Sequence, residues 1–202
     1  MADTKISALS AASAAALANE IAINEAGTTK KLTVQQIVDL IGIKTKLLGS
    51  DFASPGTTMG KATGLDYTLA AGTYWFEYRC VFQTSVAGTA VKLGVNFSGT
   101  QTLYTVECTG YEGTTAASTG AIDQSHAAFG LRSGGAERTP STTASIFGPT
   151  AIDTINANTM AIIKGVIVVT VSGDLQLYFG SEATGSTQTL KAGTALRVTK
   201  VG

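Results

Sequence analysis

The residues most able to do chemistry lie together in one segment. His126, the only histidine, closely follows Asp123 and Ser125. A Ser–His–Asp triad would use the serine as nucleophile and the histidine as its general base. Triads are assembled from distant parts of a fold, however, and the chain has no Gly-x-Ser-x-Gly nucleophile elbow. We therefore interpret His126 as a surface or interface residue and predict no catalytic residues and no enzymatic activity.

Paired carboxylates would indicate a glycoside hydrolase, which places two of them on either side of a sugar-binding groove. Glu77 and Arg79 instead share one face of a predicted strand, and most other acids fall in turns or beside basic residues. We interpret these charges as solvated or inter-subunit ion pairs. Trp75 could stack on a sugar ring, but an aromatic residue at strand spacing more often lies in a core or a subunit interface.

Metal and cofactor sites lack their usual ligands. Cys80 and Cys108 are the two cysteines, each inside a strand-like run, and the chain has no Cys-x-x-Cys motif or Cys/His cluster. This usage favours two reduced, buried thiols over a disulfide. The Gly-rich stretch 130–135, which contains Arg132, lacks the strand–loop–Lys–helix order of a phosphate-binding loop. The sequence predicts no metal and no cofactor.

Charge and hydropathy exclude two classes of partner. The 14 basic and 14 acidic residues cancel, and charged residues make up 14% of the chain, against about 25% in typical domains. A nucleic-acid-binding protein needs clustered Lys and Arg. The most apolar run, Met160 to Val171, contains Lys164 and is shorter than the ~20 residues of a membrane span. We expect no nucleic acid, no membrane and no signal peptide.

Aromatic residues divide the chain into two parts. All 14 lie between Phe52 and Phe179, so an aliphatic, Ala-rich leader (residues 1–46) precedes a Gly/Thr-rich body (residues 47–202). The large apolar side chains of the leader are too few to offset the conformational entropy lost when its backbone is ordered. We expect the leader to be ordered only against a surface, which belongs to its own body, to sister subunits or to another protein.

Two elements are predicted in the leader. Residues 21–32 fit two short strands around a Gly-containing turn. Thr33 and Gln36 form a capping box, after which apolar residues recur at helical spacing over 34–41. This helix is too short to persist alone in water. Residues 42–50 are predicted to connect the leader to the body.

The body is predicted to be β almost throughout. Its clearest strands, recognised by alternating or continuous apolar residues, are 67–69, 74–83, 91–98, 103–109, 160–171, 175–179 and 195–201. Residues 172–174 are expected to form a tight turn that joins 160–171 and 175–179 into a hairpin. Residues 110–150 hold many Gly, Thr and Ser, and we expect long loops there with two short strands, near 127–131 and 145–147.

An Ala-Gly-Thr motif recurs just before strands, at 71–73, 87–89 and 192–194. Its glycine can supply the positive φ of a turn, and its threonine starts the strand. Eight or so short strands with Gly-rich corners indicate an antiparallel, jelly-roll-like β-sandwich, with 74–83 and 160–171 as neighbours in its core. The predicted fold class is therefore mainly β, with an N-terminal arm that carries a short hairpin and one short helix.

Three stretches of the leader carry a resemblance to a known family. The residues Lys5-Ile6-Ser7-Ala8-Leu9, Ile21-Ala22-Ile23 and Gly27 to Ile37 resemble the N-terminal attachment module of many tailed-bacteriophage virion proteins, among them tail fibres, tailspikes and head-decorating proteins. The sequence departs from that module at Ser10, where Pro is common, and at Asn24-Glu25, where a more apolar stretch is usual. The resemblance implies that apolar side chains dock the leader on the virion. These residues are Ile6, Leu9, Leu17, Ile21, Ile23, Leu32, Val34, Ile37, Val38 and Ile41.

The body is similar to β-sandwich domains of phage fibre and capsid-decoration proteins. The similarity is carried by residues 63–74, by Lys92-Leu93-Gly94-Val95-Asn96 and by the block from Gly165 to Val198. Such proteins resemble one another in being homotrimers whose sandwiches pack around a three-fold axis. The resemblance therefore implies a homotrimer that binds the major capsid protein or another virion protein.

Taken together, the resemblances imply a non-enzymatic virion structural protein that is assembled in the cytoplasm of the host bacterium. We expect a trimeric capsid decoration (cement) protein or a short head fibre, because no long shaft of heptads or repeats separates leader from body. The alternative is a tail fibre or receptor-binding protein, whose body would recognise a host glycan or protein through Trp75 and the loops at 110–150. A depolymerase is disfavoured because no catalytic constellation is found.

Overall fold

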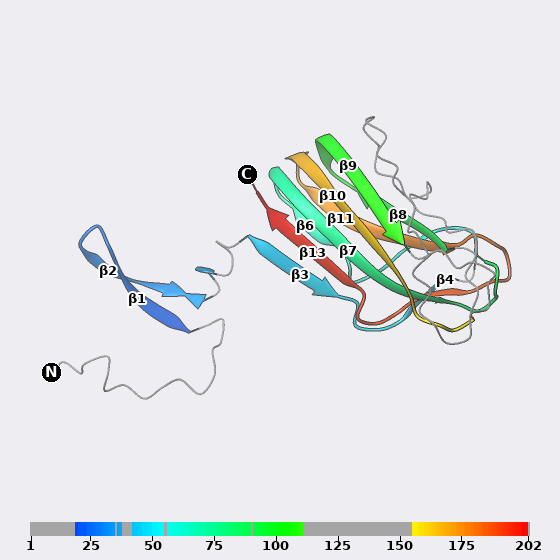
Figure 1. Cartoon of the computed structure of the whole chain (residues 1–202). Coiled ribbons are helices and arrows are strands. Elements are labelled where there is room, and N and C mark those ends of the chain that lie inside the picture. Colours follow the sequence, from blue (N-terminus) through cyan, green and yellow to red (C-terminus); the bar gives the residue numbers. More distant parts are fainter. Residues whose placement is uncertain are drawn as a thin grey trace. The chain divides into compact units, whose positions relative to one another are not determined.

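The computed structural model describes residues 19–34, 36–37, 42–54, 56–89, 91–110 and 155–201. The chain divides into two compact units, Met1–Ile43 and Lys44–Gly202, and each is considered by itself. The described residues of both units lie mainly in antiparallel strands (Figure 1). No helix is delimited among the described residues. The predicted helix 34–41 falls largely outside them, at Gln35 and residues 38–41.

The first unit contains the predicted hairpin. Strand β1 (Glu20–Glu25) pairs with β2 (Thr28–Thr33) in an antiparallel register that sets Ile21 opposite Leu32 and Ile23 opposite Lys30. The hairpin prediction for residues 21–32 is therefore confirmed.

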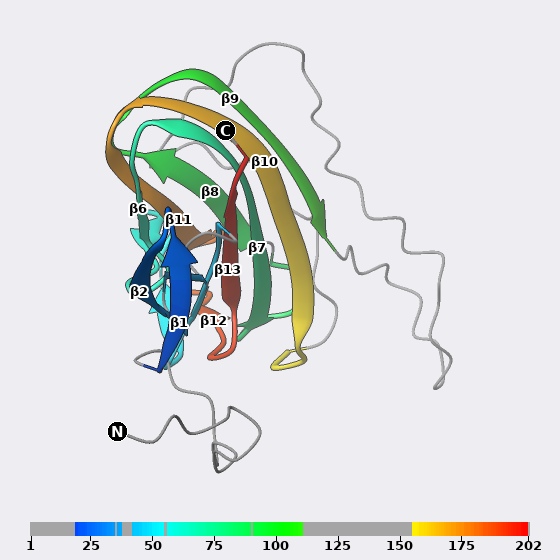
Figure 2. The ribbon, with the colours of Figure 1, turned by 90° about the vertical axis from the view of Figure 1, so that its left-hand side faces the viewer.

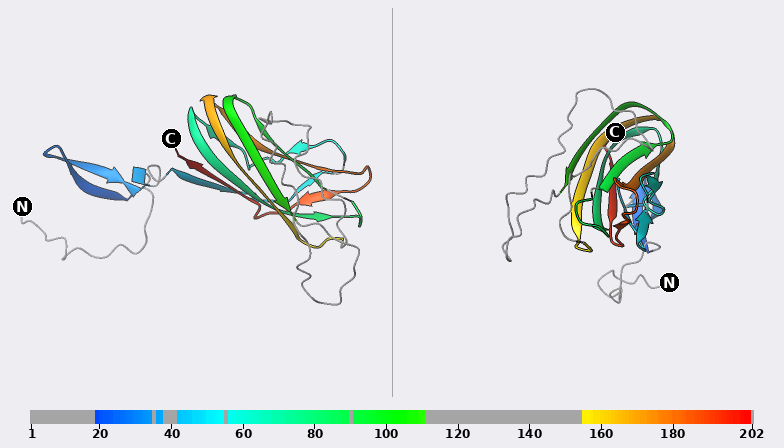
Figure 3. Two further views of the ribbon diagram at one scale, coloured as in Figure 1. Left: turned by 45° about the horizontal axis from the view of Figure 1, so that its top comes forward. Right: turned by 90° about the vertical axis from the view of Figure 1, so that its right-hand side faces the viewer.

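The second unit contains a seven-stranded sheet that is called here the large sheet. Its strands are β3 (Ile43–Leu47), β4 (Phe52–Ser54), β7 (Gly72–Thr84), β9 (Thr100–Gly110), β10 (Thr159–Val171), β12 (Gln188–Leu190) and β13 (Ala195–Lys200). The strand order is β3-β13-β7-β10-β9, and β12 extends the line of β13 because it pairs with β7 and β4. Strands β7, β10 and β9 run side by side and bend strongly along their length (Figures 2 and 3). The predicted pairing of 74–83 with 160–171 is confirmed.

A four-stranded sheet, the small sheet, completes the second unit. Its strands are β5 (Gly60–Lys61), β6 (Tyr67–Leu69), β8 (Val91–Phe97) and β11 (Gly173–Ser181). The central strand β11 pairs with β8 along one edge and with β6 and then β5 along the other. Leu175, Leu177 and Phe179 of β11 are fully buried, as their alternation predicted.

One hydrophobic core is shared by the two sheets. Strand β7 sends every second side chain into it, namely Tyr74, Phe76, Tyr78, Cys80 and Phe82, and β11 supplies its own alternate residues. The rings of Phe82 and Phe179 lie 6.3 Å apart and join the large sheet to the small one. Each large buried side chain contributes about 1.5–3 kcal/mol of hydrophobic stabilisation. The core thus fixes which face of each strand is left for the outside.

The predicted hairpin at residues 172–174 was wrong. Strand β10 belongs to the large sheet and β11 to the small one, and Ser172 alone separates them. Gly173 lacks the positive φ that a two-residue hairpin turn needs. A Cβ on Gly173 would lie 2.1 Å from the nitrogen of Gly99, where the chain passes from β8 in the small sheet to β9 in the large one. Two corners between the sheets therefore cross in direct backbone contact.

The turn motif was predicted correctly, whereas the connection between leader and body was not. Glycines of the Ala-Gly-Thr motif have positive φ, with +72° at Gly88 and +91° at Gly193. Thr194 anchors its turn, because its buried hydroxyl accepts a hydrogen bond from the Val81 N–H at 3.1 Å. Residues 42–50 were predicted as a connection but contain strand β3. The strands expected near 127–131 and 145–147 lie outside the described residues.

Candidate interaction surfaces

The hairpin of the first unit has one polar face and one face that is apolar at its open end, while Lys30 lies opposite Ile23 nearer the turn. Because side chains alternate along a strand and pair across it, Ile21, Ile23 and Leu32 share one face. The Val34 N–H donates to the Asn19 carbonyl at 2.9 Å, so Val34 lies at the open end of the hairpin, just beyond the last strand pair. Ile21 is 47% exposed, and the other three are partly buried. We call these four residues the hairpin face.

The polar face of the hairpin is held by charges. Lys31 Nζ donates to Glu20 Oε1 at 2.6 Å, and both groups are exposed. This hydrogen bond, and then the charge of the Glu20 carboxylate, raises the pKa of Lys31. An exposed pair of this kind adds little stability. It marks the side of the hairpin that faces water, so the apolar side is the candidate binding surface.

The turn of the hairpin is tight and conformationally demanding. Ala26 and Gly27 both have positive φ, of 52° and 80°, which is the backbone of a type I′ turn. The side-chain Oδ1 of Asn24 accepts a hydrogen bond from the Gly27 N–H at 2.9 Å. Glycine adopts this geometry readily, whereas alanine does so at a cost. The local sequence therefore fixes the register that gathers the apolar residues on one face.

The capping-box hydrogen bonds are present just after the hairpin. The Thr33 N–H donates to Gln36 Oε1 at 2.8 Å, and the Gln36 N–H donates to Thr33 Oγ1 at 3.1 Å. Ile37, the next predicted docking residue, is partly buried. The other predicted docking residues lie outside the described residues: Ile6, Leu9, Leu17, Val38 and Ile41.

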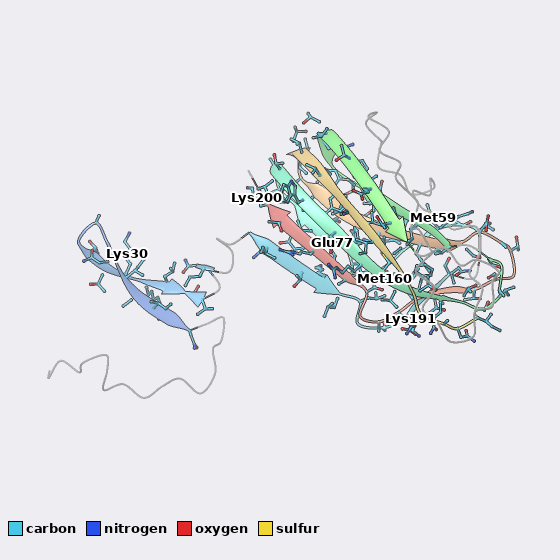
Figure 4. The ribbon with its side chains drawn as sticks, viewed as in Figure 1. Lys30, Met59, Glu77, Met160, Lys191 and Lys200 are labelled. Atoms are coloured by element: carbon cyan, nitrogen blue, oxygen red, sulfur yellow. The ribbon has the colours of Figure 1, made fainter. Side chains whose placement is uncertain are left out.

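A second candidate surface is the outer face of the large sheet. Trp75 lies there with 61% of its surface exposed, so it is not a core residue. Its cross-strand neighbours are Val166 on β10 and Thr199 on β13. Leu103 and Met160 are exposed on the same face, and Figure 4 labels Met160 and Glu77 over the large sheet. A large exposed aromatic side chain on a sheet face is a common feature of binding surfaces.

Ion pairs also lie on this outer face, as the shared strand face of Glu77 and Arg79 predicted. Arg79 Nε donates to Glu77 Oε1 at 2.6 Å, and Lys164 Nζ lies 3.7 Å from Glu107 Oε1. The hydrogen bond to Glu77 is the main cause that raises the pKa of Arg79. Arg79 and Lys164 remain more than half exposed. The predicted ion pairs are therefore present, and whether they also contact another subunit stays a prediction.

Candidate catalytic and metal-binding residues are not gathered into a site in the described part of the chain. His126, Asp123, Ser125 and the stretch 130–135 lie outside it. Within it, no group of three or more His, Cys, Asp or Glu side chains is placed to hold a metal ion. Cys80 and Cys108 are free and buried, which confirms that prediction. No helix among the described residues is long and apolar enough to cross a membrane.

A buried polar cluster escaped the sequence analysis. The fully buried Gln188 donates from Nε2 to Thr84 Oγ1 at 3.0 Å and to Ser186 Oγ at 3.2 Å. Its Oε1 is buried and has no hydrogen-bond partner among the described residues. The sequence does contain a sign of this burial. Gln188 and Leu190 are two residues apart on one strand, so their side chains point to the same side, and Leu190 is buried. A glutamine at an inward position is readily mistaken for an outward one.

The two candidate surfaces are therefore apolar or mixed faces without catalytic geometry among the described residues. In comparisons with known proteins, no family model matches the chain, and no curated protein does either.

Proposed function

We propose that the protein is a non-enzymatic bacteriophage virion structural protein, either a capsid decoration (cement) protein or a short head fibre. Its leader docks on the major capsid protein or on another virion protein, and its body forms a homotrimer. The observation that carries this proposal is the hairpin face. It is a small apolar surface on a compact unit of its own, left partly exposed and braced by a polar opposite face.

The body fits a projecting module in this proposal. Its two antiparallel sheets share one core, and we propose that they form a jelly-roll-like β-sandwich. The registers leave Trp75 and other apolar residues on the outer face of the large sheet, where contact with another protein surface can bury them. Such a module needs no catalytic residue, metal or cofactor.

Binding to purified capsids tests the docking role. The full chain is expected to bind, and a chain without residues 1–46 is expected to lose binding. Ile21→Asp should weaken binding by roughly tenfold or more, because it places a charge in the centre of the hairpin face. Ala22→Asp is the matched control, since Ala22 lies on the opposite face of the same strand and is exposed. Equal binding by the full and shortened chains would exclude the leader as the dock.

The second candidate is a tail fibre or receptor-binding protein that recognises a host surface glycan or protein. The exposure of Trp75 on the outer face of the large sheet favours it, because exposed aromatic rings stack on sugars. In that case the isolated body should block adsorption of phage to host cells, and Trp75→Ala should abolish the block. A body that binds capsids but never host cells would exclude this candidate.

A further inference from the structure

The outer face of the large sheet carries a row of charges that alternate in sign. Following the strand order β13, β7, β10, β9, the registers set Arg197 opposite Glu77, Glu77 opposite Lys164, and Lys164 opposite Glu107. The signs along this row are plus, minus, plus, minus. All four side chains project away from the core, because their strand neighbours are the buried residues. We call these four residues the charge row.

The neighbouring row on one side is apolar and Thr-rich. It consists of Thr199, Trp75, Val166 and Thr105, in the same strand order. The row beyond it contains Thr73, Val168 and the exposed Leu103. The outer face therefore combines one row of balanced charge with an exposed patch centred on Trp75.

We propose that this face binds the same face of a second copy of the chain about a two-fold axis that runs parallel to the strands, between β7 and β10. Rotation about this axis keeps each row at its own level and reverses the strand order. Glu77 then meets Lys164 of the second copy, and Arg197 meets Glu107 of the second copy. In the neighbouring row, Trp75 meets Val166 of the second copy. Every contact of the charge row joins opposite charges.

Other arrangements fit the face less well. A second arrangement has its two-fold axis in the plane of the sheet, perpendicular to the strands and along the charge row. It would bring each residue of the row against the same residue of the second copy, so that like charges would be in contact. A strongly acidic or basic partner would not match the charge of this face either. With Arg79 included, the face carries three positive and two negative charges, so its net charge is only +1. The face is therefore complementary to the same face of a second copy rather than to a strongly charged partner.

The size of the face sets the expected strength of pairing. Four strands about 4.8 Å apart in the three rows of Trp75, Glu77 and Arg79, which are about 6.8 Å apart, and three strands in the row of Thr73 span roughly 500 Å² per copy. Stable interfaces bury about 800 Å² per partner. Because the strands of the large sheet bend along their length, only the central rows of the two copies remain in contact, and Trp75 lies in one of them. We expect a reversible dimer of modest affinity.

The inference goes beyond the proposed function because it requires neither docking nor a three-fold axis. A trimer would have to use other surfaces, and copies would still pair through this one. Sedimentation equilibrium of the full chain over a wide range of concentration tests the pairing. The expected species contain an even number of copies. A chain that remains monomeric at every concentration would overturn the proposal, as would a trimer that shows no further pairing.

Variants then locate the contact. Trp75→Ser should weaken pairing by roughly tenfold or more, because large aromatic residues dominate interface energies. Val171→Ser is the control, since Val171 is 58% exposed but lies outside these rows. Circular dichroism should show that both variants are folded. Pairing that is equally strong in Trp75→Ser and in Val171→Ser would overturn the proposal.

Two double variants test the charge row itself. Glu77→Lys with Glu107→Lys makes the row wholly positive and should abolish pairing. Glu77→Lys with Lys164→Glu also changes two charges, but every contact across the axis still joins opposite charges, so pairing should be retained. Loss of pairing in both double variants, or in neither, would contradict the proposed axis.

Discussion

Gly165 on β10 lies directly opposite Phe76 on β7, and the phenyl ring of Phe76 covers the glycine on the inner face of the large sheet. A Cβ built on Gly165 would lie 2.6 Å from Phe76 Cζ and 2.1 Å from the Thr105 carbonyl oxygen on the strand to the other side. The ring of Phe76 also stacks on that of Tyr104, with centroids 6.2 Å apart. The absence of a side chain at Gly165 is therefore what allows three neighbouring strands to pack this cluster.

Gly165→Ala should destabilise the body by about 1–3 kcal/mol, because the added methyl group must displace both a backbone carbonyl and a packed ring. Urea unfolding followed by circular dichroism measures the change. Gly49→Ala is the matched control, since a Cβ at Gly49 would meet nothing within 4 Å. Equal midpoints for the two variants would show that the sheet relaxes around Gly165 without cost.

The pairing of β7 with β10 illustrates what could be predicted from the sequence. Alternating or continuous apolar runs identify the long strands and the residues that face the core, such as Leu175 and Phe179. Sheet membership does not follow from these patterns, because it depends on contacts between distant segments. The connection from β10 to β11 was therefore wrongly predicted to be a hairpin turn. The glycine in this connection, Gly173, instead allows close backbone contact with Gly99.

The candidate surfaces were predictable to different degrees. The hairpin follows from local signals, namely a turn and short strands on both sides of it, so the strands that pair Ile21 with Leu32 were predicted, while the docking role of these residues stays a prediction. For Trp75 the sequence left a core and a subunit interface open, because alternation shows that neighbouring residues face opposite sides but not which side is covered, and its exposure excludes the core. The alternating signs of the charge row arise only when the registers of four strands are known.

Ala26→Gly should stabilise the hairpin, because Ala26 has a φ of 52° and glycine adopts this conformation without steric cost. The expected gain is up to about 1 kcal/mol. Hydrogen exchange of the amides of the β1–β2 ladder should slow in this variant. Gly27→Ala should have the opposite effect, since Gly27 has a φ of 80°. Faster exchange in Ala26→Gly would contradict the type I′ turn.

The stability of the body should fall at alkaline pH because of its two buried thiols. Burial raises the pKa of Cys80 and raises that of Cys108 to about 12, from an ordinary value of 9.0. Above pH 9 the unfolded chain releases these protons while the folded chain keeps them. The folded state then binds more protons, so the free energy of unfolding decreases by up to about 1.4 kcal/mol per pH unit and thiol.

Urea unfolding at a series of pH values measures this decrease. The double variant Cys80→Ala with Cys108→Ala is the control, because it retains every other group that titrates in this range. Its unfolding free energy should fall less steeply above pH 9 than that of the parent chain. Parallel pH profiles for the two proteins would show that the thiols are not the cause.

Gln188→Glu should destabilise the body strongly at neutral pH. The side chain at this position is fully buried beside the hydroxyl groups of Thr84 and Ser186, and Oε1 of Gln188 has no hydrogen-bond partner among the described residues. A carboxylate there would be desolvated, which raises its pKa above the value in the unfolded chain. Stability is then lost as the pH rises above about 4.3, the pKa of an unfolded glutamate, and is recovered below it.

Gln188→Met removes the hydrogen-bonding groups but adds no charge, so its stability should show no such pH dependence. Thermal unfolding of both variants between acid and neutral pH measures the difference, and a Gln188→Glu profile parallel to that of Gln188→Met would mean that water reaches the cluster.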